Sequence, residues 1–112
     1  MLTWIVRSRL QDGDDKREEA ERLVADLVAS VHDQEPGAFS YAFHRNVKDP
    51  QELVLVETYS GNDEFLEHNM SPHMLKFRSR FTELFQPETT QTFMVEEIAG
   101  FGRVWPEGNA SS

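Results

Sequence analysis

Three absences in this sequence of 112 residues narrow the classes of protein to which it can belong. It contains no cysteine, which excludes a disulfide framework, a thiolate nucleophile and a zinc–thiolate centre. It contains no apolar run near the roughly 20 residues that a membrane-spanning helix needs. The start, Met1 to Trp4, lacks the basic and apolar regions of a signal peptide, so we expect a cytoplasmic protein.

Positive charge is also scarce. Lysine and arginine number 11 against 20 aspartates and glutamates, which gives a net charge of −9. Because phosphate backbones and anionic lipids attract basic surfaces, we expect no nucleic acid and no membrane as a partner. The sequence also lacks a glycine-rich phosphate loop and the glycine-x-serine-x-glycine elbow of many hydrolases. The sequence therefore gives no support for a bound nucleotide or flavin. It gives none for covalent acyl chemistry either.

The composition that remains is typical of a folded globular domain. Hydrophobic residues make up 38% of the chain, and eight of them are phenylalanines, enough for one core. We predict one domain over residues 1–99. Glycine, proline and serine gather in residues 100–112, which predicts a poorly ordered tail.

The first 37 residues predict a strand and a helix. Residues 1–10 alternate between two faces, with β-branched and aromatic side chains, as a strand does. A helix then begins near Asp15, where Glu18 three residues later resembles a capping box, and it ends before Pro36-Gly37. Apolar residues recur at helical spacing along one face: Ala20, Leu23, Val24, Leu27, Val28 and Val31.

Two more strands and a short helix follow. Residues 38–46 and 52–59 alternate or run apolar, and they predict a hairpin whose loop is somewhat longer than two residues. Residues 63–69 predict a short helix.

A second, longer helix is predicted over residues 72–85. Ser71 is a suitable N-cap, and Pro72 is tolerated at the first helical position. Pro87 then ends this helix, and residues 90–98 predict the last strand.

The order strand, helix, strand, strand, helix, strand predicts an α+β, ferredoxin-like fold. It forms a four-stranded antiparallel sheet with helices on one face. The other face then carries apolar and aromatic side chains without cover. Stacking two such faces would bury them, so we predict a homodimer.

The most informative stretch spans residues 57–73. It resembles the antibiotic biosynthesis monooxygenase superfamily, whose small dimeric α/β-barrel members include cofactor-free quinol monooxygenases. That family has Glu-x-Trp/Tyr at the end of the third strand, then a histidine, then Ser/Thr-Pro-His at the start of the longer helix. The resemblance covers residues 2–98, and these positions match the motif: Glu57, Tyr59, His68, Ser71, Pro72 and His73.

The haem-degrading branch of this superfamily uses different residues. It has an asparagine on the first strand, a tryptophan on the short helix and a histidine on the long helix. Here no asparagine precedes Asn46, and His68 and Arg78 lie where that tryptophan and histidine would be. We therefore expect no haem degradation, and a colourless protein without flavin, haem or a transition metal.

His68 is the candidate base. An imidazole titrates near neutral pH and can take a proton from a phenol or an enol. Glu57 shares a strand face with apolar residues, where a carboxylate needs a partner or has a raised pKa. It can act as a base, orient His68 together with Tyr59, or form a salt bridge; the candidate partners for that bridge are Arg7, Arg45 and Arg78.

The spacing of two histidines argues against a metal site. His68 and His73 are five residues apart, about 140° around one helix, which differs from the i, i+4 spacing that aligns two ligands. No neighbouring carboxylate motif completes a site, so we predict no metal site. His73 can instead form a hydrogen bond at the helix junction or contact the substrate.

These observations predict a monooxygenase that oxidises a small aromatic, quinol-type or enolisable substrate with dioxygen and without a cofactor. The break at Pro72 predicts a cavity between the sheet and the two helices, with His68 in its wall. We expect catalytic roles for His68, Glu57 and Tyr59, and substrate contacts from Tyr41, Asn69, His73 and Phe77. Two alternatives remain open: an isomerase that uses the same proton transfer, and a non-catalytic dimeric domain that binds a small hydrophobic ligand.

Overall fold

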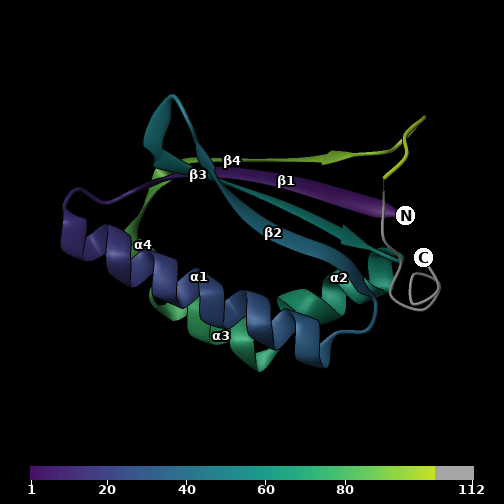
Figure 1. The fold of residues 1–112 in the computed structure, drawn as a ribbon. Coiled ribbons are helices and arrows are strands. Elements are labelled where there is room, and N and C mark those ends of the chain that lie inside the picture. Colours follow the sequence, from purple (N-terminus) through teal and green to yellow (C-terminus); the bar gives the residue numbers. More distant parts are fainter. Residues whose placement is uncertain (103–112) are drawn as a thin grey trace.

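In the computed structural model, which describes residues 1–102, one antiparallel sheet has helices packed against one of its faces (Figure 1). The strands are β1 (Leu2–Leu10), β2 (Ala38–Asn46), β3 (Asp49–Tyr59) and β4 (Phe85–Val95), in the order β2-β3-β1-β4. The predicted ferredoxin-like α+β arrangement is confirmed. Most of the predicted tail, residues 103–112, lies outside the described residues.

The helices are α1 (Asp14–Gln34), α2 (Asn62–Asn69), α3 (Pro72–Ser79) and α4 (Phe81–Leu84). The predicted apolar stripe of α1 is buried almost throughout, at Ala20, Leu23, Val24, Leu27 and Val31. No helix within residues 1–102 is long and apolar enough to cross a membrane.

The start of α1 differs from the predicted capping box. Gly13 precedes the helix with φ 109°, and no side chain caps it. Asp15 therefore lies inside the first turn. Asp14 and Asp15 still favour this end of the helix, because carboxylates there interact with its positive dipole.

The hairpin loop is shorter than predicted. Asn46 pairs with Asp49, so Val47 and Lys48 alone form the turn, and β3 begins three residues earlier than expected. The predicted long helix is also divided, because Arg80, with φ −110° and ψ 0°, leaves helical geometry between α3 and α4.

Strand β4 begins at Phe85, and Pro87, which was expected to separate helix from strand, lies within it. The register explains why proline is tolerated. Arg7 pairs with Gln91 but Arg9 with Gln86, so the strand bulges between these two pairs. Since β4 is an edge strand, a residue without an N–H group costs little there.

The junction between α2 and α3 forms as predicted. The Ser71 hydroxyl accepts a hydrogen bond from the Met74 N–H at 3.3 Å and donates one to the His68 carbonyl at 2.7 Å. Pro72 occupies the first turn of α3. The chain therefore turns sharply between His68 and His73.

The second face of the sheet is left without helices, as Figure 1 shows. Ile5 lies directly opposite Val56 on β3 and Phe93 on β4, so these side chains share that face. Phe93 is 45% exposed and Val95 37%. The uncovered face therefore carries a row of apolar side chains that is partly exposed to solvent.

Candidate functional site

A cavity of about 200 Å³ lies between the sheet and the helices, as the break at Pro72 predicted. Its wall is mostly apolar, and its aromatic members include Trp4, Phe43, Phe65, Phe81 and Phe85. A cavity lined by aromatic and aliphatic side chains suits a flat apolar ligand. Among the residues selected from the sequence, the wall includes Tyr41, Glu57, His68, Asn69 and Phe77.

Two selected residues are not in this wall. Tyr59 is fully buried beneath it, and its hydroxyl donates a hydrogen bond to Glu57 at 2.5 Å. His73 lies in a separate groove between the end of α1 and the start of α3.

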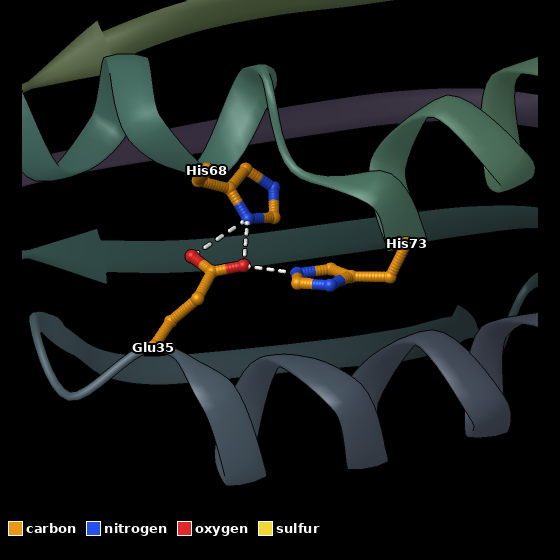
Figure 2. Close-up of side chains that lie close together, drawn as sticks. All are labelled: Glu35, His68 and His73. Atoms are coloured by element: carbon orange, nitrogen blue, oxygen red, sulfur yellow. Dashed lines mark hydrogen bonds and ion pairs between the residues drawn. The ribbon is translucent and has the colours of Figure 1, made fainter.

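The His68 side chain is buried and is positioned by two aromatic rings and a carboxylate. It is 1% exposed, and its ring packs against the rings of Tyr41 and Tyr59, with centroid distances of 5.1 and 5.3 Å. Its Nδ1 lies 2.9 and 3.0 Å from the two carboxylate oxygens of Glu35 (Figure 2).

Glu35 was not among the residues selected from the sequence. It is the residue directly after α1, 33 positions before His68. Its neighbours Pro36 and Gly37 indicate only the end of a helix, and no local motif marks the carboxylate. The packing of α1 beside the α2–α3 junction is what brings it to His68.

His73 contacts the same carboxylate, through Nε2 (Figure 2). The angle of about 140° that the five-residue spacing gives on one continuous helix does not describe this pair, because the two residues lie on separate helices joined by a turn at Ser71. The turn directs both imidazoles toward Glu35.

The contact with Glu35 determines where His68 carries its proton. A carboxylate only accepts hydrogen bonds, so Nδ1 must hold the hydrogen and Nε2 must hold the lone pair. Nε2 lies 3.9 Å from the carboxylate of Glu57, which also lines the cavity. Burial lowers the pKa of His68, although Glu35 acts in the opposite direction. The site thus holds a neutral imidazole with its basic nitrogen on the Glu57 side.

Glu57 is a buried carboxyl group with an unusual pKa. Burial raises that pKa to about 7, the hydrogen bond from Tyr59 opposes the shift, and the charge of Glu35 adds to it. Burial also raises the pKa of Tyr41 and of Tyr59, so both remain protonated phenols.

The predicted salt bridge between Glu57 and an arginine is absent from residues 1–102. Arg7 pairs with Glu52 at 3.0 Å, and Arg45 pairs with Glu21. The strand register explains the result for Arg7, because it lies on the opposite face of the sheet from Glu57. Arg78 instead donates to the Asn69 carbonyl at 2.7 Å.

The fold and the cavity define a class of small ferredoxin-like domains with an apolar site beside a buried histidine. The family model of antibiotic biosynthesis monooxygenases matches residues 1–80, which include His68, His73 and Glu35. The chain therefore belongs to this family. No curated protein matches the sequence.

Solved structures share the fold at low sequence identity. Rv0793 from Mycobacterium tuberculosis is 24% identical with a TM-score of 0.77, covering 90% of this chain and 98% of its own. PA3566 from Pseudomonas aeruginosa is 26% identical with a TM-score of 0.76, and the match covers 88% of this chain and 94% of its own. A crystal structure of an antibiotic biosynthesis monooxygenase is 17% identical with a TM-score of 0.77, and the match covers 88% of this chain and 100% of its own.

Proposed function

We propose that this protein is a cofactor-independent monooxygenase that oxidises a small aromatic, quinol-type or enolisable substrate with dioxygen. The observation that carries the proposal is the environment of His68. A buried neutral imidazole, oriented by a carboxylate at one nitrogen, has its other nitrogen free to accept a proton at an apolar cavity.

The first step is removal of a proton from the substrate. His68 Nε2 takes a proton from a phenolic or enolic O–H group, and Glu35 stabilises the imidazolium that forms. The apolar wall leaves the resulting anion poorly solvated, which makes it a better electron donor.

The substrate anion then supplies the electrons that reduce dioxygen. Two hydrogens leave the substrate, one from the O–H group that His68 deprotonates and one from the carbon that is oxidised, and one oxygen atom forms a carbonyl group at that carbon. The other oxygen leaves as water with those two hydrogens. The substrate provides all four electrons, so no other reductant enters the balance.

Oxygen uptake tests the proposal directly. Purified protein is mixed with a panel of quinols, polyphenols and enolisable ketones, and dioxygen is followed with an electrode. We expect uptake with at least one compound, and loss of that uptake in His68→Ala. Ligand binding without uptake by any compound would contradict the proposal. Conversion of a substrate to its isomer without oxygen would indicate the isomerase.

The uncovered sheet face supports a second part of the proposal, a homodimer. Sedimentation equilibrium at micromolar concentration is expected to give twice the chain mass. Ile5→Glu with Phe93→Glu should shift the protein to monomer, because these charges would be buried between two sheets. Leu75→Glu is the control, since Leu75 is 57% exposed on α3, away from this face. A wild-type monomer would contradict the prediction.

A further inference from the structure

The contacts of Glu35 with His68 and His73 bring three metal-binding side chains together. One ligand atom from each, two imidazole nitrogens and a carboxylate oxygen, lie within 4.8 Å of one another (Figure 2). The three residues come from the end of α1, from α2 and from the start of α3. We call these residues the Glu35–His68–His73 cluster.

These three ligand groups favour some divalent metal ions over others. Two imidazoles and one carboxylate suit zinc and neighbouring first-row divalent metals, whereas calcium and magnesium prefer oxygen ligands. With zinc–ligand bonds near 2.05 Å, tetrahedral geometry separates ligand atoms by about 3.3 Å. His68 Nδ1 lies 2.9 and 3.0 Å from the Glu35 oxygens, and all three ligand atoms lie within 4.8 Å of one another, so adjustment of these side chains would admit an ion.

A path for the ion is also present. Glu35 and His73 line a groove of about 420 Å³ that is separate from the substrate cavity. Glu64 and Glu67 line the same groove and favour the entry of a cation. An ion can therefore reach the cluster from the helix side without passing through the cavity.

We propose that the Glu35–His68–His73 cluster binds a divalent transition metal such as Zn²⁺, and that the bound ion stops proton transfer at His68. This site replaces the expectation, drawn from the five-residue spacing, that the histidines form no metal site. The ion is an inhibitor and not a cofactor. The binding itself is independent of the proposed monooxygenase function, while the inhibition rests on it.

The inhibition follows from the two nitrogens of one imidazole ring. A neutral imidazole carries one hydrogen, which Glu35 holds at Nδ1 in the metal-free protein. When the ion takes the lone pair of Nδ1, that hydrogen must reside on Nε2. Nε2 then becomes a donor and cannot accept a proton from the substrate.

Binding is measured by equilibrium dialysis of the full chain against Zn²⁺. We expect one equivalent per chain, and at least tenfold weaker binding in Glu35→Gln and in His73→Ala. His32→Ala is the matched control, because His32 is an exposed histidine on α1 and should leave binding unchanged. Equal binding by the wild type and both cluster variants, or no binding by the wild type, would overturn the site.

Two measurements on the wild-type protein test the metal site without any substitution. Co²⁺ should give the visible absorption of a low-symmetry site, and ¹⁵N NMR should show metal at Nδ1 and hydrogen at Nε2 of His68. Hydrogen remaining at Nδ1 with Zn²⁺ bound would refute the mechanism. Where oxygen uptake is present, one equivalent of Zn²⁺ should abolish it, and undiminished uptake would refute the inhibition. Absence of uptake with clear Zn²⁺ binding would refute the proposed function alone.

Discussion

Replacement of His68 by glutamine is expected to lower turnover by at least about 100-fold, the typical contribution of a positioned general base. Glutamine retains polar atoms near Glu35 but has no group that takes up a proton near neutral pH. The loss should appear in kcat, because proton removal belongs to the chemical step and not to binding. Single-turnover oxygen uptake with the best substrate of the panel measures it.

The comparison with Glu35→Gln separates the base from the residue that positions it. The amide oxygen of glutamine can still accept the hydrogen of His68 Nδ1, but it no longer stabilises the imidazolium. We therefore expect a smaller loss of kcat, about tenfold, with KM unchanged. Turnover at the wild-type rate in His68→Gln, with the fold intact by circular dichroism, would exclude His68 as the base.

Replacement of Glu57 by glutamine is expected to stabilise the protein above neutral pH. The Glu57 pKa is raised from 4.5 to about 7 in the folded state. Between these values the folded state retains a proton that the unfolded chain has released, so the free energy of unfolding falls as pH rises. At pH 8 the full cost of the charged group is present, roughly 3 kcal/mol for a shift of this size.

The substitution keeps the local contacts and removes only the charge. Glutamine can still accept the Tyr59 hydrogen bond, and the other polar groups nearby, Tyr41, His68 and Glu35, are unchanged. The variant should match the wild type near pH 4 and exceed it increasingly up to pH 8. Urea unfolding across this range measures the difference.

Glu52 lies on the same strand and is a control, because its pKa is shifted in the opposite direction to that of Glu57. Hydrogen bonds from Asn46 and Arg7 lower its pKa, so its charged form contributes stability above the ordinary pKa and loses it as pH falls. Glu52→Gln should therefore be destabilised at pH 8. A constant difference between Glu57→Gln and the wild type from pH 4 to pH 8 would refute the raised pKa of Glu57.

Much of the fold was predictable because the signals are local. Side-chain alternation in residues 38–46 gives a strand with the same bounds in the structure, and the apolar stripe of α1 is its buried face. Ser71 caps α3 as expected, since capping depends on residues within one turn. These features need no information about distant parts of the chain.

The predictions from the sequence were wrong where the tertiary structure overrides a local preference. Pro87 usually ends regular structure, yet here the edge position of β4 and its bulge against β1 accommodate it. The partner of Glu57 also depends on register. The arginines considered as partners contact other groups, and Tyr59, two residues away on the same strand, supplies the hydrogen bond.

The sequence by itself determined the four strands, the helix α1, the break between α2 and α3, and the selection of His68 as a residue beside a cavity. Only the tertiary structure decided which groups surround that imidazole. Glu35 reaches His68 because α1 packs beside the α2–α3 junction, a contact between residues 33 positions apart. Such a contact is set by the summed packing of many side chains, and no short pattern in the sequence encodes it.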